Sequence, residues 1–350
     1  MMENQTKIKV GIVGCGAITQ RRHAPEYAQN PNAEIAGFYD ADEKRAGELA
    51  ARYGAKVYES IDELIHDEID AVSVCSPNVT HAEVSVRALA SGRHVLVEKP
   101  MALSLHETRR MMDAARTSGK ILMPDHNQRL IPTHLKARAL LKEGAIGKPL
   151  FFQCNFKHAG PENWSINNTN ATWFFSKAQA HFGVFGDLGS HKIDLIRFLT
   201  GMEITDVFAT LMTLDKRYPD GTLIDLEDNA VCQFRMEDGM PGIMHFSWTN
   251  YGQEDNGTTV YGDRGVMKIF GDYTDDIVLE MRDHTQVKYK VSGISTNKDQ
   301  LKSGVIDEFV AAILEKRQPI VTAVDGHNTL AVLTAGIESA RERKWRRVEY

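Results

Sequence analysis

The sequence predicts an α/β protein in which an N-terminal doubly wound parallel sheet is followed by a domain with a mostly antiparallel sheet. Short apolar runs alternate with helical patterns up to about residue 127, which is typical of parallel strands covered by helices on both faces. Beyond that point several strand patterns follow one another without helices between them, which favours antiparallel pairing. A length of 350 residues suits two domains, and we place them at 1–127 and 128–350.

The elements of the N-terminal domain follow from apolar periodicity and from the turn residues between the runs. The expected strands are 7–13, 33–39, 71–75, 94–97 and 121–123. The expected helices are 18–28, 43–53, 82–90 and 104–118. Residues 71–74 carry few polar side chains, which suits a strand buried on both faces.

The C-terminal domain is expected to combine a run of strands with a few separate helices. The expected strands are 149–156, 207–213, 228–236, 242–248, 258–261 and 266–270. The expected helices are 135–143, 186–199, 306–315 and 329–341, and residues 161–175 are expected to form a loop. Two hairpin-type turns, Glu237-Asp238-Gly239 and Gly262-Asp263-Arg264-Gly265, separate neighbouring strands.

Composition and charge argue against several classes of protein. A net charge of −6 and a pI near 6.1 give no electrostatic footprint for nucleic acid. No apolar run approaches the roughly 18 residues that a membrane helix needs, and residues 1–7 lack the apolar stretch of a signal peptide. The four cysteines form no metal-binding pair: Cys15, Cys75, Cys154 and Cys232. They indicate free thiols in a reducing cytosol, so we expect a cytoplasmic protein without a metal site.

The turn after the first expected strand carries part of a dinucleotide-binding fingerprint. Gly14 permits a tight turn and Gly16 allows the backbone to approach a pyrophosphate, while the N-terminus of the next helix offers free N–H groups. Thr19 stands at the third glycine position, so the match is imperfect. Chance glycines in a turn are the alternative, but the strand–turn–helix context favours a dinucleotide site and hence a Rossmann domain.

Asp40 ends the second expected strand, where an acidic side chain can accept hydrogen bonds from the ribose hydroxyls of NAD. The same carboxylate would repel the 2′-phosphate of NADP, so NAD is favoured and NADP is the alternative. Lys44 and Arg45 lie close by in the sequence and can soften this preference. An ordinary turn aspartate is the other interpretation.

Two further turns follow strands of the same expected sheet. Cys75-Ser76-Pro77-Asn78 lies where a dinucleotide crosses the carboxyl edge of such a sheet, although a plain proline turn is an equal alternative. Glu98-Lys99-Pro100 holds Lys99 at that edge, where an ammonium group can polarise a substrate oxygen. A surface lysine beside a glutamate is the alternative, and it is favoured if this motif is taken alone.

Asp187 and His191 form the second informative cluster. They are four residues apart, so on a helix they share one face, and a histidine beside a carboxylate is suited to proton transfer near neutral pH. A metal site is a weak alternative because no further ligands stand nearby. Taken alone, the pair is better explained by a capping aspartate and a packed histidine.

In combination, these motifs resemble the glucose–fructose oxidoreductase, inositol dehydrogenase and rhizopine-catabolism (Gfo/Idh/MocA) family over nearly the whole chain. The matching segments run in the family's order: Gly11-Ile12-Val13-Gly14-Cys15-Gly16-Ala17-Ile18 with His23, Cys75-Ser76-Pro77-Asn78 with His81, Gly92-Arg93-His94-Val95-Leu96-Val97-Glu98-Lys99-Pro100, Asn127-Gln128-Arg129, Asp187-Leu188-Gly189-Ser190-His191-Lys192-Ile193-Asp194, and Tyr261-Gly262-Asp263-Arg264-Gly265. The first five of these motifs in order, with the right spacing, make a chance match improbable.

The resemblance implies an N-terminal Rossmann domain that binds NAD(P) and a C-terminal α/β domain with a large, mostly antiparallel open sheet. It implies that Lys99, Asp187 and His191 are catalytic: the histidine accepts the hydroxyl proton, the lysine polarises the oxygen, and the aspartate positions substrate or histidine. The cofactor-binding residues it implies are Gly11, Gly14, Cys15, Gly16, Ala17, Ile18, Asp40, Ser76, Pro77, Asn78, His81, Glu98, Lys99 and Asn127. Subunit contacts through the open sheet would give a homodimer or homotetramer.

The expected substrate site combines these catalytic residues with polar and aromatic neighbours of the kind that hold sugars. The residues expected to contact substrate are Lys99, Arg129, His158, Trp173, Asp187 and His191. For His158 and Trp173, a surface loop with one packed tryptophan is an equal alternative. The stretch before Asp187 departs from the glycine run common in the family, and His181 and Phe182 there either narrow the pocket or repack a turn.

The leading functional hypothesis is an NAD-dependent dehydrogenase that oxidises a secondary hydroxyl of a sugar, cyclitol or related polyol. A second hypothesis keeps NAD tightly bound and uses transient sugar oxidation for glycoside cleavage or epimerisation. A third is a dinucleotide-sensing regulator without turnover, but the presence of both Lys99 and His191 argues against a sensor. Partners other than a small-molecule substrate and further copies of the chain, such as nucleic acid or membrane, are not expected.

Overall fold

The structure is a computed structural model that describes residues 7–166, 169–271, 274–291 and 302–350. Most of the segment used to argue against a signal peptide, residues 1–6, lies outside the described residues. The described chain divides into two compact units. The first contains the chain up to His126 and a later segment that ends at His327, and the second contains the chain from Asn127 together with Asn328–Tyr350. The expected C-terminal domain, 128–350, therefore contributes a segment to the first unit.

The first unit is built on a six-stranded parallel sheet in the order β3-β2-β1-β4-β5-β6. Its strands are β1 (Ile8–Val13), β2 (Ala33–Tyr39), β3 (Lys56–Val57), β4 (Ala71–Val74), β5 (His94–Val97) and β6 (Leu122–Pro124). The strand order reverses beside β1, which is the doubly wound arrangement that the sequence predicts. The turns after β1, β4 and β5 consequently reach the same carboxyl edge of the sheet.

Helices of the first unit begin and end at residues with recognisable roles. The helices are α1 (Ala24–Gln29), α2 (Glu43–Tyr53), α3 (Ile61–His66), α4 (His81–Ala90), α5 (Leu105–Ser118) and α9 (Val305–Leu314). Ser104 caps α5 by accepting a hydrogen bond from the Glu107 N–H, and Gly119 ends it with φ of 68°. The helix expected over 18–28 contains a π-helical turn, Thr19–His23, directly before α1.

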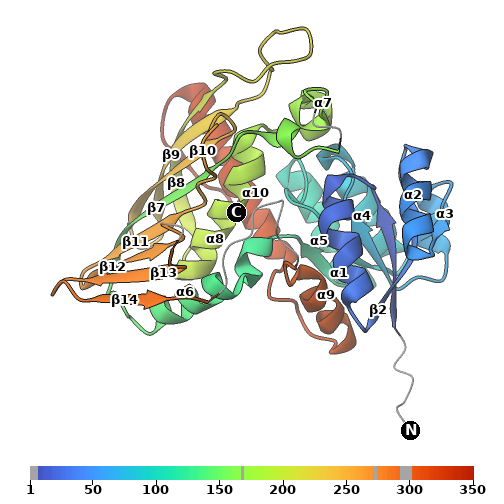
Figure 1. Cartoon of the computed structure of the whole chain (residues 1–350), viewed down its shortest axis with the longest axis horizontal. Coiled ribbons are helices and arrows are strands. Elements are labelled where there is room, and N and C mark those ends of the chain that lie inside the picture. The colour runs from blue at the N-terminus through green and yellow to red at the C-terminus, as the bar shows by residue number, and fades with distance from the viewer. Residues whose placement is uncertain (1–6, 167–168, 272–273, 292–301) are drawn as a thin grey trace. The chain divides into compact units, whose positions relative to one another are not determined.

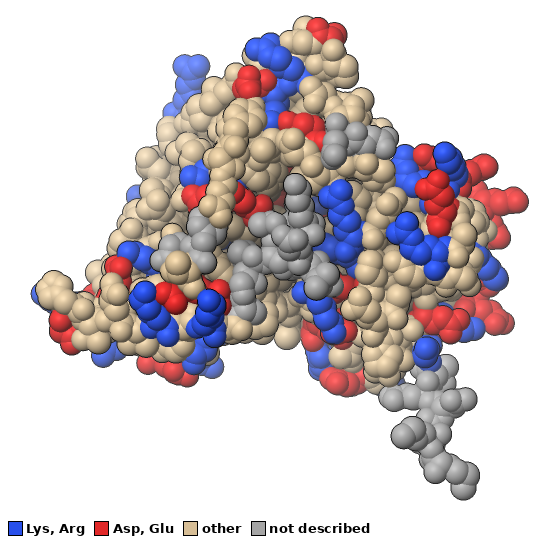
Figure 2. All heavy atoms as spheres, in the orientation of Figure 1, with Lys and Arg blue, Asp and Glu red and all other residues tan. Residues whose placement is uncertain are grey.

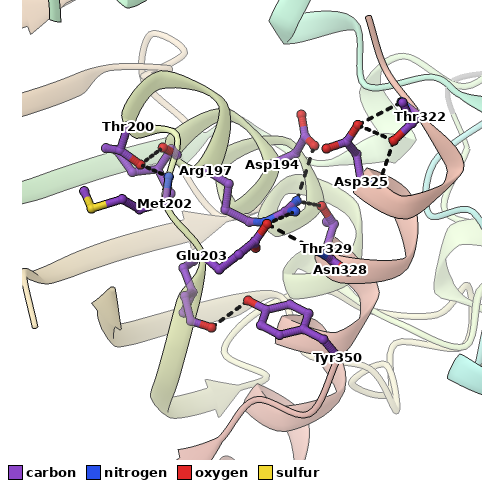
Figure 3. Close-up of polar contacts among 12 residues, drawn as sticks. Asp194, Arg197, Thr200, Met202, Glu203, Thr322, Asp325, Asn328, Thr329 and Tyr350 are labelled. Atoms are coloured by element: carbon purple, nitrogen blue, oxygen red, sulfur yellow. Dashed lines mark hydrogen bonds and ion pairs between the residues drawn. The ribbon is translucent and has the colours of Figure 1, made fainter. Parts of the chain in front are cut away.

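The segment with α9 is bonded into the first unit at three places. The Ser303 N–H donates to Glu26 (2.8 Å), and the Asn30 side chain donates to Asp307 (2.8 Å). Thr108 Oγ1 lies 2.6 Å from His327 Nδ1, in the first turns of α10 (Ala323–Glu342). Thr322 and Asp325 exchange hydrogen bonds at the start of that helix (Figure 3), in the manner of a capping box.

The second unit contains a nine-stranded sheet in the order β14-β13-β12-β11-β7-β10-β9-β8-β15. Its strands are β7 (Pro149–Lys157), β8 (Ile204–Met212), β9 (Asn229–Met236), β10 (Pro241–Ser247), β11 (Thr258–Gly262), β12 (Gly265–Ile269), β13 (Ile277–Met281), β14 (Gln286–Tyr289) and β15 (Arg346–Arg347). Within this second sheet, only β7 and β10 pair in parallel among the described strands. The mostly antiparallel sheet is therefore confirmed, and β13, β14 and β15 are strands that the sequence analysis missed.

One face of this sheet is covered and the other carries exposed apolar side chains. The helices α6 (Pro132–Lys142) and α8 (Ser190–Thr200) pack against β12 and β7 (Figure 1). Alternate residues of β7 point into this interface, and Phe152, Cys154 and Phe156 are buried. Residues exposed on the other face include Val231, Ile243 and Tyr261.

Charged groups of both signs are interspersed on the face drawn in Figure 2. No helix among the described residues is long and apolar enough to cross a bilayer.

Candidate functional site

The glycine turn after β1 has the backbone geometry that a dinucleotide site requires. Gly14 has φ of +95°, and a Cβ there would lie 2.6 Å from the backbone nitrogen of Ser76, so a larger residue would be strained. A Cβ at Gly16, by contrast, would meet nothing within 4 Å. The backbone of Gly16 therefore faces open space, as expected where a pyrophosphate approaches.

Thr19 explains why the fingerprint tolerates the loss of its third glycine. Its buried hydroxyl donates a hydrogen bond to the carbonyl of Gly14 (2.6 Å). The next residue adds a second hydrogen bond, in which the side-chain amide of Gln20 donates to the carbonyl of Cys15 (3.1 Å). The π-helical segment is thus bonded back to the turn, while Ala17 and Ile18 form the start of the helix at its phosphate-facing end.

Asp40 joins the end of β2 to the glycine turn. Its Oδ2 accepts from the N–H of Cys15 (2.6 Å), and its Oδ1 accepts from the N–H of Asp42 (2.8 Å). Arg45 Nη1 lies 3.8 Å from Oδ1, and a shorter contact of 2.9 Å joins Arg45 to Asp42. Each carboxylate oxygen has a second lone pair, so the residues present fit the adenosine ribose of NAD.

Replacing Asp40 by asparagine is expected to shift the ratio of the dissociation constants for NADP and NAD by about tenfold towards NADP, or ~1.4 kcal/mol. The amide oxygen still accepts from Cys15, but the negative charge that repels a 2′-phosphate is lost. Titration calorimetry with both cofactors measures the ratio. The matched control is Asp42→Asn, which leaves Asp40 in place; an unchanged ratio in D40N would show that Asp40 does not select the cofactor.

The turns after β4 and β5 are held together by His81. Its Nδ1 lies 2.8 Å from the carbonyl of Pro100, and its Nε2 lies 2.9 Å from the carbonyl of Ser76. The ring is buried, and burial lowers the pKa of His81. The structure thus shows His81 bracing the two turns, and its expected contact with the cofactor stays a prediction.

Lys99 lies half-buried in the turn after β5, at the same sheet edge as Gly14 and Ser76. Its backbone N–H donates to Oε2 of the preceding Glu98 (3.1 Å). Asn78, in the turn after β4, is buried. The first unit therefore gathers the expected cofactor residues of its three turns along one edge.

In the second unit, Asp187 lies in a π-helical turn, Phe185–Gly189, and His191 lies in the first turn of α8. The regular helix expected over 186–199 is thus irregular at the aspartate. The indole N–H of Trp248 donates to Asp187 Oδ2 (3.2 Å), and Asp187 is 8% exposed. Trp248, from the strand end at β10, fixes the carboxylate, and no local sequence signal identifies this contact.

Phe156 of β7 brings two expected site histidines together. Its ring lies edge-on to His191 (5.6 Å between centroids) and edge-on to His158 (5.9 Å). His158 is buried, and its Nδ1 accepts a hydrogen bond from the Gly160 N–H (3.0 Å). The second unit therefore places Asp187, His191 and His158 around β7 and the start of α8.

The segment before Asp187 is packed tightly, which favours the interpretation that Phe182 repacks a turn. This side chain is buried, and a Cβ at Gly186 would overlap it. Glu227 accepts hydrogen bonds from the N–H groups of Gly183 (2.9 Å) and Phe185 (3.3 Å), and burial raises the pKa of Glu227. Phe182 is therefore packed within the turn, the His181 side chain is exposed, and any effect of either residue on the substrate pocket stays a prediction.

Trp173 belongs to an aromatic cluster on the loop after β7. Its ring stacks on Phe174 (3.9 Å between centroids), and Phe174 in turn meets Trp164 edge-on (4.9 Å). The ammonium group of Lys216 anchors this loop by donating to the carbonyl of Ala159 (2.6 Å) and by pairing with Glu162. Lys216 is an anchor that the sequence analysis did not identify, because its partners lie over 50 residues away.

Arg129 is held inside the second unit by a buried ion-pair network. Its guanidinium makes two hydrogen bonds to Asp194 (2.7 and 2.6 Å). Arg197, on the same helix as Asp194, binds Glu203 with both Nε and Nη2 (2.5 and 2.8 Å) and donates to Thr329 (3.1 Å) (Figure 3). This geometry favours a structural role for Arg129, and its contact with substrate stays a prediction.

The amide oxygen of buried Asn127 has no hydrogen-bond partner within the described part of the chain. An unpartnered buried acceptor is expected to meet a ligand or water. The expected contact of Asn127 with the cofactor stays a prediction.

Two family models cover most of the chain. Residues 8–126 match the model of an oxidoreductase family with an NAD-binding Rossmann fold, and residues 134–268 match the C-terminal domain of the same GFO/IDH/MocA family.

Individual relatives agree with these models. Glucose-6-phosphate 3-dehydrogenase of Bacillus subtilis is 34% identical over 63% of this chain, and the alignment spans only 62% of that relative. Myo-inositol 2-dehydrogenase of Thermotoga maritima is 25% identical over 96% of this chain and 97% of its own. The crystal structure of GenD2 from gentamicin A biosynthesis in complex with NAD is 26% identical, with a TM-score of 0.82 over 99% of this chain and 97% of that chain. The chain therefore belongs to the GFO/IDH/MocA family and is an NAD-binding oxidoreductase.

Proposed function

We propose that this protein oxidises a secondary hydroxyl of a sugar, cyclitol or related polyol, with NAD as hydride acceptor. The observation that carries the proposal is the Asp187–His191 pair, in which Trp248 holds the carboxylate four residues before the imidazole. The two relatives above are named as dehydrogenases of a phosphosugar and of an inositol, which supports this class of substrate.

The proposed chemistry removes two hydrogens from the carbinol group: the hydrogen on carbon goes to the cofactor as hydride, and the hydrogen on oxygen goes to the protein as a proton. Bound NAD supplies the carbon that accepts the hydride. His191 takes the hydroxyl proton, because an alcohol gives up its hydride readily only when this proton leaves as well. Lys99 polarises the hydroxyl oxygen, and Asp187 orients the substrate or the imidazole. His158 and Trp173 contribute polar and aromatic contacts to the sugar.

The proposal also covers the choice of cofactor, the contact between subunits and the cellular compartment. Asp40 selects NAD over NADP because of its charge. The exposed apolar residues of the nine-stranded sheet, among them Val231 and Ile243, form the contact between copies in a homodimer or homotetramer. The protein acts in the cytoplasm, where its four cysteines stay reduced; all four are free and buried.

The test is NADH formation from NAD across a panel of sugars, sugar phosphates and cyclitols. We expect turnover with at least one ring polyol and none with linear primary alcohols. Products are analysed in parallel without added NAD. A changed sugar with no NADH would show that the cofactor stays bound and is recycled, and NAD binding without any turnover would show a sensor; either result would overturn the proposal.

A further inference from the structure

Three buried or nearly buried side chains meet in the first unit beside the Lys99 turn. His23 Nε2 lies 3.1 Å from Glu98 Oε1 and 3.3 Å from Asp125 Oδ2. His23 and Asp125 are 2% and 4% exposed, and Glu98 is 12% exposed. None of the chemistry proposed above uses His23 or Asp125.

The two carboxylate contacts require a proton on Nε2 of the imidazole. Two carboxylate oxygens near one ring nitrogen repel a lone pair there, whereas a shared N–H satisfies both. The other ring nitrogen, Nδ1, lies 2.9 Å from Ser73 Oγ, which can accept a second N–H. The raised pKa of His23 favours the imidazolium, in which Nδ1 donates to Ser73 and both ring protons are engaged.

The pKa shifts agree with this geometry. Burial alone lowers the pKa of His23, but the neighbouring Cys75 and the hydrogen bonds to Asp125 and Glu98 raise it well above its usual value. Burial alone raises the pKa of Glu98, and the hydrogen bond and charge of His23, with Lys99 and Arg22, bring it below its usual value. Tyr27, whose pKa burial raises, is a further titratable neighbour of the ring.

The cluster is connected to Lys99 by the second oxygen of Glu98. Oε1 faces His23, while Oε2 accepts the backbone N–H of Lys99 (3.1 Å). Ser73 belongs to β4, Glu98 follows β5, and Asp125 follows β6. One imidazolium thus ties together the ends of three neighbouring strands and orients the carboxylate that holds the Lys99 backbone.

We propose that His23, clamped between Glu98 and Asp125, is a positioning residue that fixes Lys99 for the oxidation reaction. This inference rests on the role proposed above for Lys99. Its physical basis is that a small misplacement of a reacting group, of about 1 Å, costs on the order of a hundredfold in rate. A merely structural histidine would change stability but not the behaviour of the Lys99 turn.

The kinetic test uses His23→Gln, Glu98→Gln, the double variant and a matched control, His106→Gln. His106 is exposed on α5 in the same unit. We expect H23Q to lower kcat by about tenfold to a hundredfold with little change in KM for NAD, and H106Q to match the wild type. Because H23Q leaves Glu98 buried without its cation, adding E98Q is expected to cost less than the product of the two single effects.

A second measurement does not depend on turnover. We expect the His23 ring in histidine-labelled protein to show an imidazolium nitrogen spectrum above pH 7.5, where a free ring is neutral because its usual pKa is about 6.5. The Lys99 amide is expected to exchange with solvent slowly in the wild type and in H106Q, and much faster in H23Q.

The outcomes separate this inference from the proposed function. Unchanged kcat and unchanged Lys99 exchange in folded H23Q would overturn the inference. One zinc ion per purified chain, lost in H23Q, would also overturn it, because a metal would then take the place of the proton. A wild type that oxidises no polyol but shows the expected exchange pattern would contradict the proposed function alone.

Discussion

Replacing His191 by asparagine is expected to lower kcat by about 10²–10⁴-fold, because removal of a general base has an effect of that size. Asparagine can still contact the hydroxyl but cannot take its proton at neutral pH. The residues that form the glycine turn and its bond to Asp40 belong to the first unit, so the affinity for NAD is expected to stay within about twofold.

The measurement is NADH formation under saturating substrate, with NAD binding followed by calorimetry. His284→Asn is the matched control: it is exposed, lies between β13 and β14, and has φ of 69°, which asparagine adopts readily. Equal turnover in H191N and H284N would rule out His191 as the base. A loss of NAD binding in H191N would instead assign the effect to the fold.

Replacing Asp194 by alanine is expected to lower the free energy of unfolding by about 3–5 kcal/mol. The carboxylate makes two hydrogen bonds to Arg129 and lies 3.7 Å from Arg197. All three side chains are buried. Alanine would therefore remove the carboxylate that binds Arg129, and Arg197 would keep Glu203 but lose the nearby charge of Asp194. Breaking a buried pair by removing one partner costs far more than the pair contributes when intact.

Urea denaturation monitored by tryptophan fluorescence measures this loss. Glu338→Ala serves as the control, because Glu338 is half exposed and lies 3.9 Å from Arg346; a surface pair of this kind contributes roughly 0–1 kcal/mol. A difference below about 1 kcal/mol between D194A and the wild type would mean that the network is not a stabilising unit.

The parallel sheet could be predicted well because its strands are short apolar runs buried on both faces. β2, α2 and β5 have the bounds expected from the sequence. β14 (Gln286–Tyr289) escaped prediction because it is an edge strand with mostly exposed side chains. It exists through pairing with β13, and such pairing leaves little trace in the local pattern.

In the candidate site, too, features set by neighbouring residues could be predicted, whereas contacts between residues far apart in the chain could not. The spacing of Asp187 and His191 is readable in the sequence because helical periodicity places both on one face. Their partners Trp248 and Phe156 are at least 30 positions away in strands, and register between strands is set by the assembled sheet. The π-helical turns at Thr19–His23 and Phe185–Gly189 add one residue per turn to a pattern that otherwise indicates ordinary helix.

The return of α9 to the first unit has a consequence for how the chain matures. Glu26, Asn30 and Thr108 find their partners only at Ser303, Asp307 and His327. During synthesis the ribosome must therefore translate most of the second unit and then Ser303, Asp307 and His327 before the nucleotide-binding unit can complete its contacts. Until then the first unit lacks part of its structure. A premature stop codon anywhere before α9 would leave both units of the enzyme incomplete.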